Sequence, residues 1–562
     1  MKRKVIASLL AGLMLFSFTA CGKDEKDTNT QDSNKEQIVV DGNTLDAQQY
    51  YNGYLFSEPS TLDSVKGNDS YGNSVLINIM EPLTRMDEVN GVNERVGAGA
   101  ESWTSNEDGT VWTFKIRDNK WSDGQAVTAE DYAYGITQTL SPEAGSPNAY
   151  LITCIKNGVA VNNGEKPVSE LGVKALDEST LEITLENPTP YFLSLTDTRA
   201  MFPLRKDIVE KYGETYGAEM DTIVGNGPFK IEKWTHNSEI KLVKNENYWD
   251  ANNVYLENVN WKIINDESAI FNSFENGSLD GCSTGTPEWI EKFKGKDDVD
   301  YITYVIPSVR FFFFNTEDEL FKNENIRKAF TVAINREDVA KAIFFDTMAP
   351  AYSWVPQGVS TGELGDYREL VDEPLKAICK EDPKELLLKG MKELGLGDDP
   401  SKITIKFTLG DTNQWIRNFG EYYQQKYKEI LGVNVELDCN EWGTFQSKTN
   451  SGDYQMGYMV WGIDYNDPIS MLELMTSNAG AIPTFWSNSE YDELIEQASK
   501  EMDEKKRVEL YQKAEEILFQ EGCALCPVVN ESTHSFRYSY VKNASTTSFN
   551  SMGLKKVYTS GR

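Results

Sequence analysis

The sequence is poor in histidine and carries no recognisable catalytic motif. Only two histidines, His236 and His534, occur among its 562 residues, so a metal site built on imidazoles and general-base chemistry by histidine are poorly supported. A metalloprotease histidine pair, a phosphate-binding glycine loop and a nucleophile elbow are also missing. We therefore expect a binding protein rather than an enzyme, with no catalytic residue, no metal and no cofactor.

Cysteine is scarce as well, with seven residues spread over the whole chain. This excludes a small scaffold held together by disulfides. Cys523 and Cys526 have the only suggestive spacing. No second pair accompanies them, and they follow an expected helix instead of beginning one, where a thiol pKa would be lowered. Buried thiols or a local disulfide are therefore favoured over a redox or zinc site.

Basic residues are outnumbered. Lys and Arg total 55 against 88 Asp and Glu, a formal net charge of −33. Nucleic acids and anionic membrane faces attract clusters of lysine and arginine, so neither is an expected partner. The excess of acid is compatible with cationic ligands, although a solvated acidic surface is the more common explanation.

Beyond the first 21 residues, no run is apolar enough for a membrane helix. The opening has basic residues at 2–4, an apolar stretch from Val5 to Phe18 and then small residues, which is typical of a secretory signal over residues 1–20. Cys21 after these small residues resembles a lipoprotein processing site, with Phe18 where Leu is usual. An ordinary signal peptide that is cleaved nearby is the alternative.

Residues 21–40 are expected to be the lipidated Cys21 followed by a tether. Residues 22–37 contain no apolar side chain, so they cannot compensate the entropy lost on folding. A flexible chain of this length spans roughly 20–25 Å. We expect the protein outside the cytoplasm, anchored to the cell membrane by lipid at Cys21 alone.

The remainder predicts a mixed α/β chain in which strands and helices alternate. Residues 111–116 alternate apolar and polar side chains, as in a half-buried strand. Asp123-Gly124 predicts a turn, and Thr128 with Asp131 resembles a capping box at a helix start. Further helices are expected, from their apolar spacing, over residues 326–334, 337–345, 490–500 and 505–520.

Trp121-Ser122-Asp123-Gly124 followed by Thr128-Ala129-Glu130-Asp131 resembles the signature of extracellular solute-binding family 5. These proteins serve peptide and nickel ABC importers. Other segments are similar to motifs of the same family: residues 57–63, 225–229, 245–249, 314–316 and 326–336.

The resemblance implies an α/β fold of two lobes, the class II periplasmic-binding-protein-like fold, with the ligand enclosed between the lobes. The first lobe would comprise residues 41–310 and 533–562, with an extra subdomain at about 89–212. Residues 311–532 would form the second lobe. Phe311–Phe314 and Val528–Asn530 would lie in the two strands that cross between the lobes.

Residues 461–468, WGIDYNDP, are similar to the Trp-x-x-Asp-Tyr-Asn-x-Pro motif of oligopeptide-binding members, whose aspartate holds the peptide N-terminus. The resemblance implies that Asp464 would take this role, with Gly462 and Tyr465 beside it as ligand-binding candidates. From spacing alone, Asp464 would be a turn or cap residue. In a closed and dry site its carboxylate would require a cation, and the α-ammonium of a peptide is one.

Three aromatic residues join the site by the same comparison. Trp442 and Trp461 match residues that line side-chain pockets, and Tyr150 matches a cleft tyrosine of the extra subdomain; packing in the core is the alternative for each. Tyr458 stands where the family's best-known member has a basic residue near the peptide carboxylate. Anchoring of the peptide C-terminus is therefore not predicted.

The function implied is capture of an extended peptide by β-augmentation, hinge closure, and delivery to an importer permease whose ATPase is a separate chain. We expect a monomer. The alternatives are a binder of nickel chelate, oligosaccharide or haem, and a peptide-sensing lipoprotein that signals without import. A secreted hydrolase is disfavoured by the missing catalytic motifs.

Overall fold

The structure is a computed structural model that describes residues 38–89, 92–545 and 553–562. The chain divides into two compact units, residues 1–44 and 45–562. In the first, β1 (Val39–Val40) and β2 (Asn43–Thr44) form a hairpin whose turn, Asp41-Gly42, has positive φ at both positions, as a two-residue hairpin turn requires. Cys21 lies outside the described residues. Within the described part of the chain, no helix is long and apolar enough to cross a membrane.

The second unit contains the sheet that positions the candidate site. Its strand order is β13-β19-β14-β18-β16-β17, with β15 also paired to β19. The strands are β13 (Gly281–Ser283), β14 (Val299–Phe314), β15 (Ala349–Pro350), β16 (Thr404–Leu409), β17 (Asn434–Cys439), β18 (Met456–Gly462) and β19 (Leu525–Tyr538).

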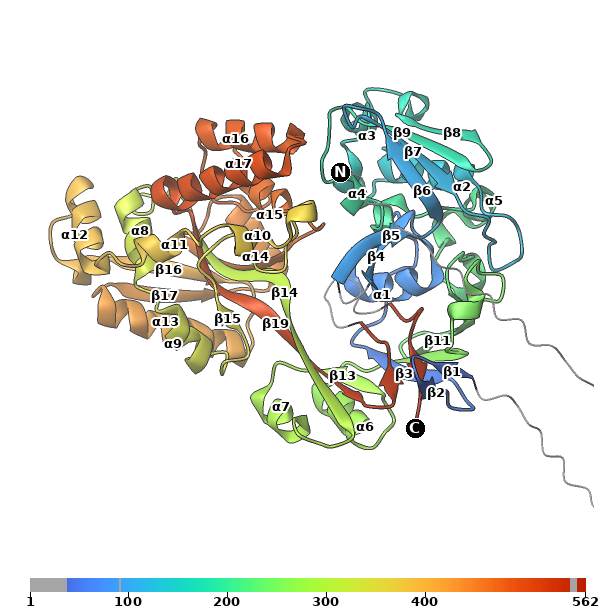
Figure 1. The fold of residues 1–562 in the computed structure, drawn as a ribbon. Helices are drawn as coiled ribbons and strands as arrows, with labels where there is room; N and C mark the ends of the chain where they lie inside the picture. The colour runs from blue at the N-terminus through green and yellow to red at the C-terminus, as the bar shows by residue number, and fades with distance from the viewer. Residues whose placement is uncertain (1–37, 90–91, 546–552) are drawn as a thin grey trace, which may run out of the picture. The chain divides into compact units, whose positions relative to one another are not determined.

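Two long antiparallel strands, β14 and β19, run side by side through this sheet (Figure 1). The four-phenylalanine run ends β14, and all four rings are buried. Successive side chains of a strand point to opposite faces. Accordingly, Phe311 and Phe313 join one hydrophobic cluster, and Phe312 and Phe314 join another. The prediction of a buried strand here is confirmed, whereas the role of β14 and β19 as crossings between two lobes stays a prediction.

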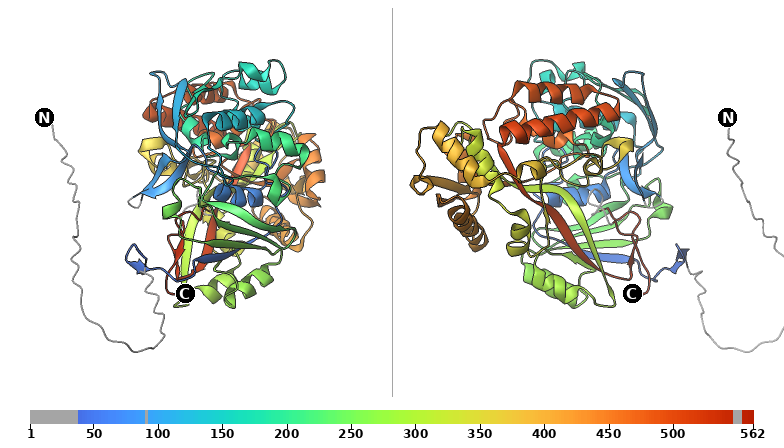
Figure 2. Two further views of the ribbon diagram at one scale, coloured as in Figure 1. Left: turned by 90° about the vertical axis from the view of Figure 1, so that its right-hand side faces the viewer. Right: turned by 60° about the vertical axis from the view of Figure 1, so that its left-hand side comes forward.

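Helices cover both faces of the sheet, and each predicted helix is present. They are α8 (Glu324–Val332), α9 (Arg336–Ala342), α16 (Ser489–Lys500) and α17 (Glu504–Ile517). The side chain of Asn335 caps α9 by accepting from the amide of Asp338 at 3.0 Å, which explains the break between α8 and α9. The helices α16 and α17 lie side by side (Figure 2).

The unit also has two two-stranded sheets, β4 (Thr84–Val89) with β5 (Val92–Gly97) and β20 (Val541–Lys542) with β21 (Tyr558–Thr559), and two four-stranded sheets. One has the order β10-β11-β12-β3 and the other β6-β7-β9-β8. Their strands are β3 (Tyr50–Leu55), β10 (Phe229–Thr235), β11 (Glu239–Lys244), β12 (Asn258–Ile263), β6 (Ala100–Ser105), β7 (Val111–Ile116), β8 (Val173–Asp177) and β9 (Thr180–Thr184). The predicted strand is β7, and the predicted capping box of Thr128 and Asp131 begins α2 (Ala129–Leu140).

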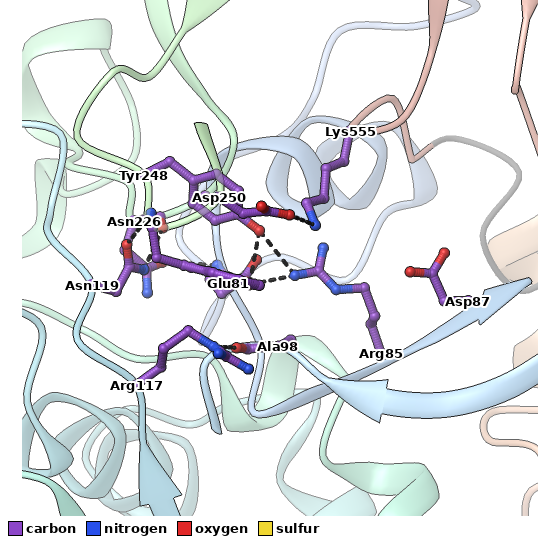
Figure 3. Close-up of polar contacts among 12 residues, drawn as sticks. Glu81, Arg85, Asp87, Ala98, Arg117, Asn119, Asn226, Tyr248, Asp250 and Lys555 are labelled. Carbon is purple, nitrogen blue, oxygen red and sulfur yellow. Dashed lines mark hydrogen bonds and ion pairs between the residues drawn. The ribbon is translucent and has the colours of Figure 1, made fainter. Parts of the chain in front are cut away.

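Two family-like segments meet at Glu81, whose side chain is buried (Figure 3). Its Oε1 accepts from the hydroxyl of Tyr248 at 3.0 Å and from the indole N–H of Trp249 at 2.8 Å. The amide of Glu81 donates to Oδ1 of Asn226 at 2.8 Å, and Arg85 forms an ion pair with its carboxylate. The segments 225–229 and 245–249 are thus held to the segment at 81–85 by a polar network in the fold.

Cys523 and Cys526 are free and buried. Burial raises the pKa of the Cys526 thiol to about 12, so the thiolate that reacts is disfavoured. Of the two alternatives that the sequence leaves open, the structure has buried thiols. No group of three His, Cys, Asp or Glu that could hold a metal occurs in the described ranges.

Candidate functional site

The candidate site lies at one edge of the seven-stranded sheet. The strands β16, β17 and β18 are parallel, so their carboxyl ends meet at the same edge, where α/β sheets commonly bind ligands. Trp415 follows β16, Trp442 follows β17 and Asp464 follows β18. The topology therefore gathers three residues that are far apart in the sequence.

β18 has a backbone edge that no described strand covers. On one side it pairs with β14 from Met456 to Gly462, but on the other side β16 reaches only Met456 and Gly457. The amide of Ile463 donates to the carbonyl of Pro307, on the β14 side. Because alternate residues of a strand direct their N–H and C=O groups to opposite sides, Val460 and Gly462 direct theirs to the open edge.

Asp464 begins the turn that follows this edge. Its amide donates to the hydroxyl of Ser470 at 2.8 Å, which fixes the turn, and its side chain is exposed. Burial by nearby protein nonetheless raises the pKa of Asp464, while a hydrogen bond from Tyr150 lowers it. In the part of the chain that the structure describes, no cationic side chain contributes to this pKa. Solvent reaches Asp464 in this structure, and a dry carboxylate in a closed site stays a prediction.

Tyr150 is brought to Asp464 from a distant part of the chain. It lies in a short 3-10 helix, Ala149–Ile152, and 58% of its surface is exposed. The pKa of Tyr150 is raised by burial, by the nearby charge of Asp464 and by hydrogen bonding to that carboxylate. Tyr150 and Asp464 are thus adjacent, as a shared binding site requires.

We expected Tyr465 at the ligand-binding surface, but its side chain is directed into the protein. Its ring is buried and stacks on Tyr191 with a centroid separation of 5.0 Å, and its hydroxyl donates to Glu473 at 2.7 Å. Tyr465 therefore supports the turn instead of facing solvent. Glu473 was not predicted from the sequence. Burial, together with the charges of Asp464 and Asp467, raises the pKa of Glu473 to about 7.

Asp467, the second acid of the motif, is a structural residue. It is buried, lies 3.3 Å from the guanidinium of Arg507 and accepts from the hydroxyl of Tyr511 at 2.8 Å. It also accepts from the amide of Ile469 at 3.1 Å, at the start of α15 (Ile469–Leu472). These bonds hold the turn on which Asp464 stands.

The two predicted tryptophans differ in exposure. Trp461 lies on β18 opposite Val309 and is half-buried against the core. Trp442 is 50% exposed in the first turn of α14 (Trp442–Asn450), with its ring stacked on Phe445. Gly462, at the end of β18, has no neighbour closer than 3.6 Å to the position of a Cβ. Packing therefore does not require glycine there. The absence of a side chain at Gly462 leaves the backbone of the open edge accessible.

Trp415 is a further exposed tryptophan at this edge that sequence reasoning missed. It lies in the first turn of α13 (Gln414–Ile430), is 44% exposed and stacks on Phe419 at 5.2 Å. Asn413 caps this helix by accepting from the amide of Ile416 at 2.9 Å. A tryptophan beside a capping Asn just after a strand was the available signal.

The hydroxyl of Tyr458 contacts a cationic side chain of the neighbouring strand. Arg310 on β14 donates to the hydroxyl of Tyr458 at 2.7 Å and to the carboxylate of Glu531 at 2.6 Å. A basic group therefore lies beside Tyr458 even though residue 458 is not basic. Because Glu531 neutralises it, Arg310 gives no clear anchor for a peptide carboxylate.

Comparison with known proteins places these features in a family. A sequence model described as bacterial extracellular solute-binding proteins, family 5 Middle, matches residues 94–482. The dipeptide-binding protein DppE of Bacillus subtilis is 36% identical over 467 residues, which is 83% of this chain and 84% of that protein. The periplasmic oligopeptide-binding protein OppA of Salmonella typhimurium is 31% identical, with 76% and 78% covered.

Solved structures agree with these matches. The Haemophilus influenzae OppA complex with the peptide RPPGFSPFR superimposes with a TM-score of 0.76 at 25% identity, over 92% of this chain and 100% of that one. Listeria monocytogenes OppA bound to peptide gives a TM-score of 0.73 at 30% identity, over 92% and 99%. The predicted fold class is therefore confirmed.

Proposed function

Since the chain belongs to family 5 of the bacterial extracellular solute-binding proteins, we propose that it captures peptides outside the cytoplasm for an ABC importer. The proteins it resembles are named for dipeptide and oligopeptide binding, and two of the similar solved structures hold a peptide. The protein is a binder, not an enzyme. The importer's permease is a separate chain that receives the peptide from it, and the ATPase is a further separate chain.

The observation that carries this proposal is the open edge of β18 leading to Asp464. An extended peptide adds to such an edge as a new strand, because its backbone forms the hydrogen bonds that the edge lacks. Val460 and Gly462 offer N–H and C=O groups in the required direction. Since these bonds involve only backbone atoms, they bind peptides of many sequences.

Asp464 fixes the direction of the peptide. A carboxylate with no cationic partner, beside the hydroxyl of Tyr150, suits the α-ammonium of a peptide, which donates up to three hydrogen bonds. The peptide N-terminus then lies at the carboxyl end of β18, and the peptide runs antiparallel to that strand. Trp461 and Trp442 contact its side chains from the same edge.

Native mass spectrometry of the purified protein tests the proposal. We expect one-to-one complexes with free-amine peptides, and the peptides should be recovered uncleaved after prolonged incubation. Complexes only with nickel chelates, oligosaccharides or haem would contradict the peptide assignment. Cleavage products that scale with protein concentration would contradict the assignment as a binder.

The membrane anchor is a second part of the proposal. Cys21 follows a signal-like segment and precedes a polar tether, which supports lipidation of Cys21. Cys21→Ala should release the protein from the membrane fraction with peptide binding unchanged, because Cys21 lies far along the chain from the site residues. Retention of Cys21→Ala in the membrane fraction would refute the anchor.

A further inference from the structure

Two exposed tryptophans, Trp415 and Trp442, flank the open edge of β18. Each contacts a different face of the sheet through a second aromatic ring. Trp415 stacks on Phe419, whose ring lies 6.1 Å from that of Phe312. Trp442 stacks on Phe445, whose ring lies 6.3 Å from that of Phe313.

Phe312 and Phe313 are successive residues of β14, so their side chains point to opposite faces. Their membership of two different hydrophobic clusters agrees with this. Trp415 and Trp442 therefore stand on opposite faces of the sheet, both at its carboxyl edge. Beyond Gly457, no described strand pairs with the edge of β18 that lies between the two tryptophans.

The face of Trp415 continues to the open edge itself. Tyr458 lies on this face, with its ring 4.5 Å from that of Phe419. Val460, two residues further along β18, shares the face of Tyr458 and is 39% exposed. Phe344 adds a ring 6.3 Å from Trp415. Val460 and Trp415 are exposed apolar side chains of this face, and the ion pair of Arg310 with Glu531 lies beside the buried ring of Tyr458.

We propose that Trp415 selects the side chain of the peptide residue that pairs with Val460, and that Trp442 selects the side chains of the two residues next to it. This inference rests on the proposed peptide function. Residues directly opposite each other on adjacent strands place their side chains on the same face. A peptide residue paired with Val460 therefore directs its side chain toward Trp415, and its two neighbours direct theirs toward Trp442.

The ligand class that follows is a peptide with aromatic or large apolar side chains at these positions. Aromatic side chains gain by packing against indole rings beyond the burial of their area. A charged carboxylate would gain nothing from these rings. Each tryptophan acts on the peptide side chains that face it and is indifferent to those on the opposite face of the sheet.

Calorimetric titration with penta-alanine and its five single phenylalanine variants tests this. The readout is the affinity ratio of each phenylalanine peptide to penta-alanine, measured with wild type, Trp415→Ala and Trp442→Ala. In wild type we expect phenylalanine to raise affinity about fivefold to tenfold at favourable positions. Trp415→Ala should abolish the gain at the position that pairs with Val460 and spare its two neighbours, Trp442→Ala should do the reverse, and Trp415→Phe should retain the wild-type pattern.

Circular dichroism and thermal unfolding of each variant establish that it is folded. Equal loss of the phenylalanine gain at all positions in Trp415→Ala would overturn the inference, as would no loss at any position. The inference also fails if both tryptophan variants affect the same positions. Those results leave the proposed function intact, since the peptides still bind. Failure of the wild type to bind any of the six peptides would overturn both.

Discussion

Replacement of Glu473 by glutamine should stabilise the protein at alkaline pH and change little at acidic pH. Glu473 is largely enclosed, and its nearest charges, Asp464 and Asp467, are of the same sign. Tyr150, Cys154, Tyr191 and Tyr465 also face it. Among the described residues, no cation contributes to the pKa of Glu473, and Arg507 is paired with Asp467. The folded protein therefore favours the protonated form of Glu473.

The pH range and the magnitude follow from the pKa. The pKa of Glu473 rises from an ordinary 4.5 to about 7 on folding. Below pH 4.5 both folded and unfolded chains hold the proton, so there is no penalty. Between pH 4.5 and 7 the unfolded chain loses the proton first, and the free energy of unfolding falls as pH rises. Above pH 7 the penalty reaches about 3 kcal/mol.

Glutamine removes the charge and can still accept the hydrogen bond from Tyr465. Urea unfolding followed by tryptophan fluorescence should give a Glu473→Gln variant that matches wild type at pH 4.5. At pH 8 the variant should be more stable by up to about 3 kcal/mol. Glu493→Gln, at an exposed position of α16, is the matched control and should change stability little at either pH. A difference that is the same at both pH values, or a variant less stable at pH 8, would refute this account of Glu473.

Two further substitutions test the support of the site by denaturant unfolding. Asp467→Ala should lower the free energy of unfolding by about 3–5 kcal/mol, because it leaves the buried guanidinium of Arg507 unpaired; a loss below about 1 kcal/mol would contradict a structural role. Gly457→Ala should cost about 1–3 kcal/mol, since a Cβ there would lie 2.3 Å from the buried ring of Phe313. Gly462→Ala, with no neighbour closer than 3.6 Å, is its control for stability and should be nearly neutral.

The regular elements were predictable because their signals are local. The capping box of Thr128 and Asp131 needs only four residues to begin α2, and the alternation at residues 111–116 specifies β7. The buried phenylalanine run of β14 was likewise readable, since four consecutive large apolar residues suit a strand that is covered on both faces.

The candidate site was predictable only in part, because its members meet through long-range pairing. Asp464 and Trp442 were recognised by resemblance, and Tyr150 does lie beside Asp464. The sequence did not show which residues of the motif face the ligand and which support the turn. Tyr465 and Asp467 turn inward to Glu473 and Arg507, although both belong to the same motif as the exposed Asp464.

Trp415, Glu473 and Arg310 were missed for a physical reason. Trp415 belongs to the site only because β16 and β18 are parallel neighbours, which no local pattern records. Glu473 is one acid among 88 Asp and Glu residues and becomes unusual only through its burial. Arg310 reaches Tyr458 across the β14–β18 register, in which Arg310 pairs with Val460.

The most direct test of the peptide function is a calorimetric cycle on Asp464. Wild type and Asp464→Asn are titrated with one peptide in its free-amine and N-acetylated forms. A hydrogen bond to a charged group contributes about 1.5–3 kcal/mol, and the exposure of Asp464 argues against the larger values of fully buried pairs. Each single change should therefore weaken binding by about tenfold to a hundredfold.

The two losses should not add, because both remove the same interaction between the carboxylate and the α-ammonium. Asp453→Asn, at an exposed aspartate in the turn before β18, is the matched control and should bind as wild type does. Our account predicts that Asp464→Asn binds the free and acetylated peptides with nearly equal affinity, close to that of wild type for the acetylated peptide. Binding of the free peptide by Asp464→Asn within about threefold of wild type would contradict the central claim that Asp464 holds the peptide N-terminus.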